Sequence, residues 1–254
     1  MEMPDEIAGR KVILWALVGS RGCGLATEDS DEDRFALVSP LFEDLYRGNM
    51  YHKQTVTLTE DVDVHDVRKL PDLLWKSSPV MLSVLFSPEI LVPDTFAAPY
   101  IYRILEMRDS IASMNLPRLW SATMGAFDGR MSRLERDTES AAFMIEEYGY
   151  NTKQAMHALR SLMILRRFAD TRFTDFGYSI SADPATRELL LSVKRGRFTL
   201  EEFNAVVEEE LTKTKALEPL YKSAEPDTGA RDIVDQEILK LTRASVFESD
   251  RKTS

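Results

Sequence analysis

Residues 11–38 constrain the fold of this chain most, because they join two strand-like runs through one short loop. Residues 11–18 (KVILWALV) form a β-branched, apolar run that predicts a buried strand, and this run ends at Gly19-Ser20. Residues 33–38 (DRFALV) predict a second strand. The loop between them closes with Asp31-Glu32-Asp33. A small-residue turn and an acidic pair are therefore expected at neighbouring strand ends.

The acidic pair has the spacing of a metal site. Asp31 and Asp33 are two positions apart, so on a strand their side chains face the same way. Carboxylate oxygens are hard ligands that suit Mg²⁺ or Mn²⁺. We expect a third carboxylate from a neighbouring strand, and the alternating run 54–64 predicts that strand. Asp63 is the first choice for the third ligand and Asp61 the alternative.

The small-residue turn has the chemistry of a phosphate site. Gly19 lets the backbone approach a phosphate closely, and the Ser20 hydroxyl and free N–H groups can donate to it. Arg21 can add charge-assisted hydrogen bonds. Either motif alone is compatible with an ordinary surface turn. Their order after a buried strand, with a further acidic strand downstream, favours a site for a nucleoside triphosphate and metal ions.

The periodicity of the chain changes near residue 95. Before it, strand patterns alternate with short helical ones; after it, the pattern is helical. The fold class expected is α+β, with a small mixed β-sheet domain at residues 1–95, an all-helical domain at 96–246 and a flexible tail at 247–254. The helices expected in the second part are 98–114, 117–136, 139–147, 151–170, 184–195, 199–221 and 229–246.

Charge and composition exclude several classes of protein. The net charge of −10 argues against a general DNA coat protein, which needs a broad positive surface. No apolar run approaches the roughly 20 residues that span a bilayer, and residues 1–10 are unlike a signal peptide. The single cysteine, Cys23, excludes an internal disulfide and a cysteine-rich zinc site. We therefore expect a cytoplasmic protein that does not enter membranes.

A second group of candidate residues lies on the helix expected at 151–170. At about 100° per residue, Lys153, His157 and Arg160 fall on one stripe, which Arg167 continues. The stripe is either a solvated face or a set of cations that binds phosphate. Lys69 has the same two interpretations, whereas His65 is interpreted as an ordinary strand-end residue.

An extended motif resembles a known family. Gly19-Ser20, residues 24–27 (GLAT) and residues 30–33 (SDED) match the pattern Gly-Ser-x-x-x-Gly-Leu-Ala-Thr-x-x-Ser-Asp-x-Asp. This pattern is similar to that of bacterial and phage nucleotidyltransferases linked to RNA repair, within the DNA polymerase beta-like superfamily. The likeness continues through Leu85-Phe86-Ser87-Pro88, the Lys153 helix and Lys194-Arg195-Gly196.

The resemblance implies a function and a site. It implies transfer of a nucleoside monophosphate from an NTP such as ATP to an acceptor hydroxyl, with Mg²⁺ or Mn²⁺ and release of pyrophosphate. The acceptor it suggests is an RNA end or tRNA; a protein side chain or small molecule stays open, as does the oligomeric state. The implied metal ligands and catalytic residues are Asp31, Asp33 and Asp63, and the implied phosphate-binding residues are Gly19, Ser20, Arg21, Lys69, Lys153, His157 and Arg160.

Two other functions remain compatible with the sequence. One is a non-catalytic, regulatory binder of nucleotide or RNA on the same scaffold. The other is a toxin or anti-defence nucleotidyltransferase that modifies a host molecule. The retention of all three carboxylates favours the enzyme over the binder.

Overall fold

The structure is a computed structural model that describes residues 2–28, 30–57, 60–135 and 142–253. The chain divides into two compact units. Unit 1 comprises Met1–Met114 and Asp227–Ser254, and unit 2 comprises Asn115–Pro226. Each unit is described separately below.

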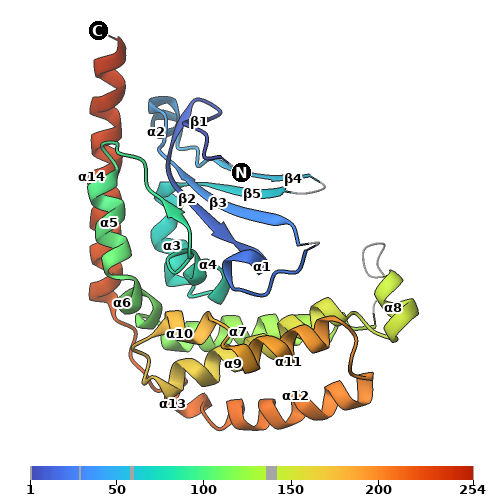
Figure 1. Cartoon of the computed structure of the whole chain (residues 1–254). Coiled ribbons are helices and arrows are strands. Elements are labelled where there is room, and N and C mark those ends of the chain that lie inside the picture. Colours follow the sequence, from blue (N-terminus) through green and yellow to red (C-terminus); the bar gives the residue numbers. More distant parts are fainter. Residues whose placement is uncertain (1, 29, 58–59, 136–141, 254) are drawn as a thin grey trace. The chain divides into compact units, whose positions relative to one another are not determined.

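Unit 1 is built on one mixed sheet (Figure 1). The strand order is β1-β2-β3-β5-β4, and β6 pairs with β2. Among the described strand pairs, β3 and β5 run parallel and the others are antiparallel. The strands are β1 Glu6–Ile7, β2 Arg10–Val18, β3 Glu32–Val38, β4 His52–Val56, β5 Glu60–Asp66 and β6 Ile90–Leu91.

The apolar runs of the sequence form the centre of this sheet. Strands β2 and β3 carry the longest buried stretches, as their β-branched and aromatic residues predict. On one face Val12, Trp15, Ala36, Val38 and Val64 form a cluster in which each side chain is at most 2% exposed. This core fixes the register of the strands that carry the candidate site, and the mixed sheet confirms the predicted α+β class.

Short helices connect the strands of unit 1, and one long helix completes it. They are α1 Gly19–Gly22, α2 Phe42–Arg47, the 3₁₀ turn η1 Val67–Lys69, α3 Leu70–Trp75, α4 Pro79–Val84, α5 Ala98–Glu106, α6 Arg108–Ser113 and α14 Thr228–Thr253. Pro71 lies in the first turn of α3, where its missing N–H breaks no helical hydrogen bond.

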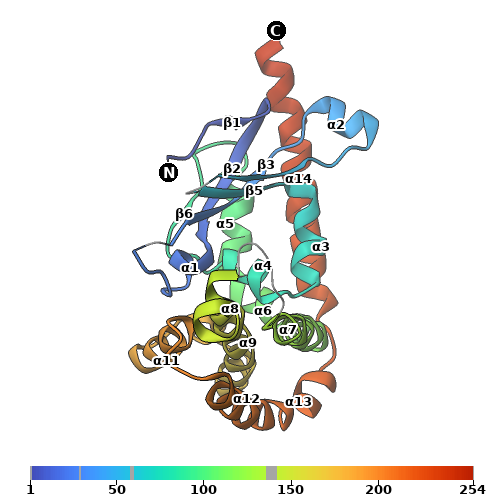
Figure 2. The same ribbon diagram turned by 90° about the vertical axis from the view of Figure 1, so that its right-hand side faces the viewer.

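The long helix α14 packs on α3, α5, α6 and η1 (Figures 1 and 2). Its Arg231 pairs with Asp72 at 3.1 Å and lies 4.8 Å from the centre of the Trp75 ring. This division of the chain differs from the predicted one, which put the boundary at residue 95 and residues 229–246 in the helical domain. Helical periodicity locates an apolar face, but it does not reveal which surface covers that face.

Unit 2 is an insertion in unit 1. The N–H of Asp227 donates to the carbonyl oxygen of Met114 at 2.7 Å. The chain therefore leaves unit 1 and returns to it at adjacent residues.

The regular structure in the described residues of unit 2 is helical, as predicted for this part of the chain. Its central helix is α9, which packs on α7, α10, α11 and α12. Polar caps begin several of the helices; the side chain of Asn151, for example, accepts from the N–H of Gln154 at the start of α9. The helices are α7 Leu116–Met131, α8 Ala142–Tyr148, α9 Thr152–Asp170, α10 Phe176–Ile180, α11 Pro184–Lys194, α12 Leu200–Lys215 and α13 Glu218–Lys222.

The ends of two predicted helices lie outside the described residues, because residues 136–141 separate α7 from α8. Within the described ranges, none of the helices combines the length and apolar character that a bilayer span requires.

Two leucines of α14 test how much unit 1 depends on this helix. Leu241 is fully buried, whereas Leu239 in the same helix is 51% exposed. We expect Leu241→Ala to lower the free energy of unfolding by about 2–5 kcal/mol, because it leaves a cavity. Leu239→Ala should change it by less than about 0.5 kcal/mol. Urea unfolding measures both, and equal effects would contradict the packing of α14 on unit 1.

Candidate nucleotide and metal site

Gly19 brings the two ends of the loop motif together. It follows β2, and the β2–β3 register pairs Val18 with Asp33. A Cβ atom on Gly19 would lie 1.7 Å from Oδ2 of Asp33, and Gly19 has a φ of +64°. Only glycine permits this approach at that backbone angle. The predicted phosphate turn therefore lies directly against the second aspartate of the predicted metal pair.

Side chains of the extended motif hold the loop in shape. The guanidinium of Arg21 donates to the carbonyl oxygens of Ser30, at 2.6 Å from Nη2, and Asp31, at 3.2 Å from Nε. The N–H of Thr27 donates to Oγ of Ser30 at 2.8 Å, and Leu25 is fully buried. Arg21, predicted to bind phosphate, is thus already bonded to the segment that carries Asp31.

Ser20 differs from Arg21 in this respect. Its hydroxyl forms no hydrogen bond within the described part of the chain. It is half-buried in α1, directly after Gly19. The hydroxyl is therefore available to a ligand.

The β3–β5 register places three carboxylates on one face of the sheet. Asp33 pairs with Asp61, and Phe35 pairs with Asp63. Directly paired residues of neighbouring strands face the same side, and residues two apart on a strand do as well. Asp61 is therefore opposite Asp33, with Asp63 one pair further along. Asp61 also accepts a hydrogen bond from Nε2 of Gln54 at 3.0 Å.

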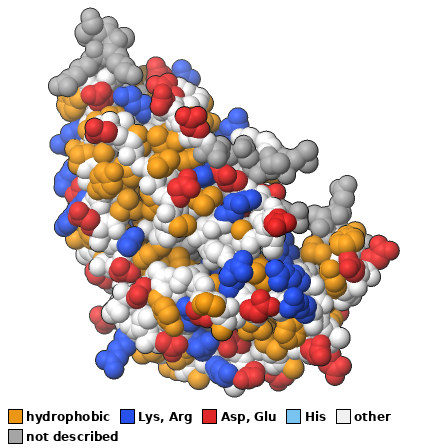
Figure 3. All heavy atoms as spheres, viewed as in Figure 1, with side chains coloured by type: hydrophobic (Ala, Val, Ile, Leu, Met, Phe, Trp, Pro, Cys, Tyr) orange, Lys and Arg blue, Asp and Glu red, His pale blue; other side chains and the backbone are white. Residues whose placement is uncertain are grey.

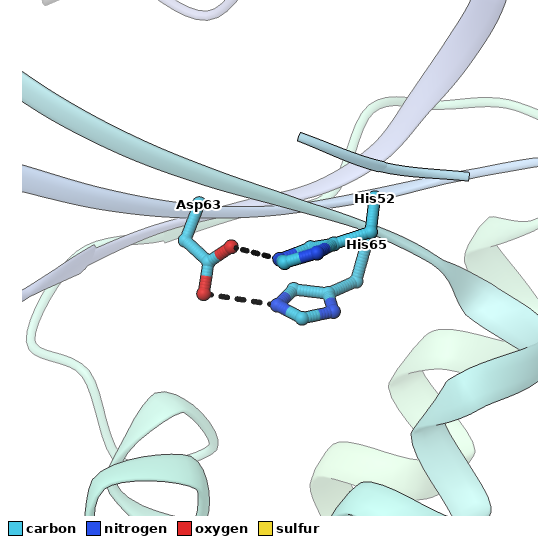
Figure 4. A group of neighbouring side chains, drawn as sticks. All are labelled: His52, Asp63 and His65. Carbon is cyan, nitrogen blue, oxygen red and sulfur yellow. Dashed lines mark hydrogen bonds and ion pairs between the residues drawn. The ribbon is translucent and has the colours of Figure 1, made fainter. Parts of the chain in front are cut away.

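Asp63 is engaged by two histidines. Its Oδ1 lies 2.9 Å from Nε2 of His52, and its Oδ2 lies 2.9 Å from Nε2 of His65 (Figure 4). Burial alone would raise the pKa of Asp63, but the contacts to His65 and His52 outweigh it and lower that pKa below its ordinary value. Among the described residues, these three form the one group of three or more His, Cys, Asp or Glu side chains whose ligand atoms lie within 4.8 Å of one another.

Asp31 and Asp33 do not belong to that group. Asp31 is exposed, immediately before β3, and Asp33 is half-buried at the start of the strand. The role of His65 is one that sequence reasoning missed. The two-residue spacing of Asp63 and His65 indicates that their side chains share one face of the strand. The contribution of His52, however, depends on the pairing of β4 with β5, which the sequence does not specify.

The Leu-Phe-Ser segment anchors the end of β2. Oγ of Ser87 donates to the carbonyl oxygen of Leu17 at 2.6 Å, and the N–H of Leu17 donates to the carbonyl oxygen of Glu89 at 2.9 Å. These bonds hold the strand end that precedes Gly19. Lys69, the remaining predicted phosphate ligand of unit 1, is half-buried in η1 and forms no ion pair with a described residue.

In unit 2, cationic side chains from other helices lie near the predicted basic stripe. The start of α9 lies beside two other chain segments. The N–H of Asn151 donates to the carbonyl oxygen of Leu134, which follows α7, at 2.7 Å. Oγ1 of Thr152 donates to the carbonyl oxygen of Lys194 at the end of α11, at 2.9 Å. Figure 3 shows Lys and Arg side chains gathered over this part of unit 2.

We call Arg130, Lys153, His157, Arg160 and Lys194 the cationic group. Burial, followed by the positive charges of Arg130, Arg160, Lys153 and Lys194, lowers the pKa of His157 from 6.5 to about 3. His157 is therefore neutral at pH 7 and can both donate and accept hydrogen bonds.

The cationic group has few internal partners. No described carboxylate pairs with Arg130, Lys153 or Arg160, and the Nε atom of Arg130 is buried without a hydrogen-bond partner. Arg160 donates to the carbonyl oxygen of Ile180 at 3.2 Å. Arg130 was not predicted from the sequence, because it lies on another helix. Arg167, which continues the predicted stripe, is instead 5% exposed and pairs with Asp183 at 2.6 Å.

The mixed sheet, with its Gly-Ser turn against an Asp-x-Asp strand, defines the class of polymerase beta-like nucleotidyltransferases. The sequence profile of the RNA repair pathway DNA polymerase beta family (RlaP) matches residues 5–236, and the chain belongs to this family. No curated protein sequence matches the chain. Family membership supports nucleotidyltransferase activity in general, with a nucleotide as substrate, and such enzymes generally use divalent metals.

Two glycines in the loop test the contact between Gly19 and Asp33. Both have positive φ, but a Cβ on Gly24 would meet nothing within 4 Å. Either Gly→Ala change should cost about 1 kcal/mol of stability from backbone strain. Only Gly19→Ala should also displace Asp33 and weaken Mn²⁺ binding by about tenfold or more. Isothermal titration with Mn²⁺ measures the difference, and equal Mn²⁺ affinities would refute it.

The lowered pKa of His157 leads to a separate prediction about stability. The unfolded chain binds a proton at His157 below pH 6.5, but the folded protein does so only near pH 3. Stability should therefore fall as the pH drops below 6.5, by about 2 kcal/mol at pH 5 from this residue. His157→Gln should remove that part of the pH dependence. Nitrogen chemical shifts of His157 that titrate near pH 6.5 in the folded protein would contradict the prediction.

Proposed function

We propose that this protein transfers a nucleoside monophosphate from an NTP to an acceptor hydroxyl, with Mg²⁺ or Mn²⁺ and release of pyrophosphate. One observation carries the proposal. The Gly19 backbone lies against the carboxylate of Asp33, so a phosphate-binding turn and a metal-binding strand meet at one point. Membership of a polymerase beta family supports the same reaction class.

The metal ligands that we propose are Asp31, Asp33 and Asp61. Their oxygens are the hard donors that Mg²⁺ and Mn²⁺ prefer. The strand register supports Asp61 over Asp63, because Asp61 is opposite Asp33 whereas Asp63 is held by two histidines. Divalent metal at these carboxylates supplies charge stabilisation at the reacting phosphate and lowers the pKa of the attacking hydroxyl.

The Gly19-Ser20 turn binds the phosphates of the NTP that leave as pyrophosphate. The Ser20 hydroxyl, which has no partner in the described chain, donates to a phosphate oxygen together with backbone N–H groups. Arg21 acts mainly through the loop, since its bonds to Ser30 and Asp31 hold the acidic pair in position. Lys69, also predicted to bind phosphate, follows β5 at the end where Asp66 pairs with Val38, whereas the turn lies at the end where Asp33 pairs with Asp61, so we do not assign it to this turn.

The cationic group of unit 2 binds phosphate oxygens in its own right. Lys153, Arg160 and Arg130 have no carboxylate partner among the described residues, so their charges are available to an anion. Neutral His157 contributes a hydrogen bond rather than a charge. These features, with the RNA repair description of the family, support an RNA end as the acceptor.

Substitution of the aspartates tests the reaction. With labelled NTP, Mg²⁺ and an RNA ending in a 3′-hydroxyl, Asp31→Asn and Asp33→Asn should each lower transfer by about 10²–10³-fold or more, because a charged ligand is lost. Asp61→Asn should lower transfer by as much, and Asp63→Asn should lower it by less. Asp94→Asn, at an exposed position of the same unit, is the matched control.

The outcomes separate the candidate functions. Transfer that survives Asp31→Asn combined with Asp33→Asn would refute the mechanism. Tight NTP binding that does not depend on Mg²⁺, without any transfer, would indicate a non-catalytic binder. Equal transfer to an RNA that ends in a 3′-deoxynucleotide would exclude the 3′-hydroxyl as acceptor.

A further inference from the structure

We propose that His52, Asp63 and His65 form a binding site for a divalent transition-metal ion of the Zn²⁺ type, distinct from the carboxylate site for Mg²⁺. The inference goes beyond the proposed function, because it concerns different ligands and a different class of metal. It depends on the positions of the three side chains, on the burial of His65 and on the chemistry of the donor atoms.

The strand pairing brings the three side chains together. His52 on β4 is directly opposite His65 on β5, and Asp63 lies two residues before His65 on the same face. The two imidazole rings stack with centroids 4.4 Å apart, and the carboxylate of Asp63 faces both Nε2 atoms (Figure 4). The three ligand atoms already lie within 4.8 Å of one another. Small side-chain rotations therefore bring them to the bond lengths of about 2.1 Å that Zn²⁺ requires.

The hydrogen bonding of His65 points to a missing ligand. His65 is only 8% exposed, and both of its ring nitrogens are buried without a hydrogen-bond partner in the described chain. Its Nε2 lies 2.9 Å from Oδ2 of Asp63, which is an ion-pair contact without the geometry of a hydrogen bond. Buried polar atoms without partners are costly. A metal ion bound to Nε2 would give one of these two ring nitrogens a partner.

The donor set selects the class of metal. Two imidazole nitrogens and one carboxylate oxygen suit Zn²⁺, Co²⁺ or Mn²⁺, whereas Mg²⁺ prefers oxygen ligands alone. The side chains of His52 and Asp63 are 46% and 39% exposed, so the site is open to solvent. Solvent access allows the ion to enter and leaves a coordination position for water.

The metal would tie β4 to the rest of the sheet. Strand β4 is at the edge of the sheet, and all of its residues are exposed. Apart from the backbone ladder, Asp61 and Asp63 on β5 are held by Gln54 and His52 from this strand. A metal bridge from His52 to β5 therefore fixes the strand that carries the third carboxylate of the proposed catalytic site.

Titration of the whole protein with Zn²⁺, without nucleotide, tests the site. We expect one bound Zn²⁺ per chain, a higher melting temperature with Zn²⁺ than with an equal concentration of Mg²⁺, and visible absorption bands on addition of Co²⁺. His52→Ala should lower Zn²⁺ affinity by about 100-fold or more, because a direct ligand is lost. His52 is exposed, so this variant is expected to fold. His65→Gln and Asp63→Asn should have the same effect on affinity.

Matched controls exclude other ligands. The chain has three histidines and one cysteine. His157→Gln and Cys23→Ser should therefore leave Zn²⁺ affinity unchanged. Asp31→Asn combined with Asp33→Asn should also retain it, which separates this proposal from the proposed function. Absence of Zn²⁺ binding, an affinity that survives His52→Ala, or an affinity for Mg²⁺ equal to that for Zn²⁺ would each overturn the inference.

Discussion

The approach of the Gly19 backbone to the Asp33 carboxylate is the constraint on which the candidate site depends. It exists because β2 ends and β3 begins at paired positions, Val18 and Asp33. The register between β3 and β5 then places Asp61 opposite Asp33. Any side chain on Gly19 would occupy the space of the carboxylate. A buried apolar sheet therefore sets the position of polar atoms that have little packing of their own.

Each unit carries its own candidate groups. Unit 1 holds the carboxylates of the proposed metal site and the Ser20 hydroxyl, and unit 2 holds Arg130, Lys153 and Arg160, which no described carboxylate neutralises. Burial of His157, together with the positive charges around it, lowers its pKa and keeps the imidazole neutral at pH 7. An anion that binds there would relieve the repulsion among these charges, so their clustering is itself a reason to bind one.

Much of this architecture could be predicted from local sequence. Residues 12–18 and 35–38 are apolar, so their strands form wherever they can be buried, and the motif between them identified the family. The role of His65 could not be predicted in this way, because it depends on the partner that β4 provides. The packing of α14 and the buried pairing of Arg167 with Asp183 depend likewise on distant parts of the chain. Periodicity describes a single element, whereas these features belong to pairs of elements.

The insertion of unit 2 into unit 1, which the hydrogen bond from Asp227 to Met114 closes, has a consequence for the order in which the units are completed. Because unit 1 contains both the first and the last parts of the chain, ribosomal synthesis finishes unit 2 before it delivers α14. Until then, α3 and α5 lack the helix that covers their apolar sides. All of unit 2 is therefore synthesised while unit 1 still lacks one of its helices, and unit 1, which carries the candidate active site, cannot reach its full stability before α14 is made.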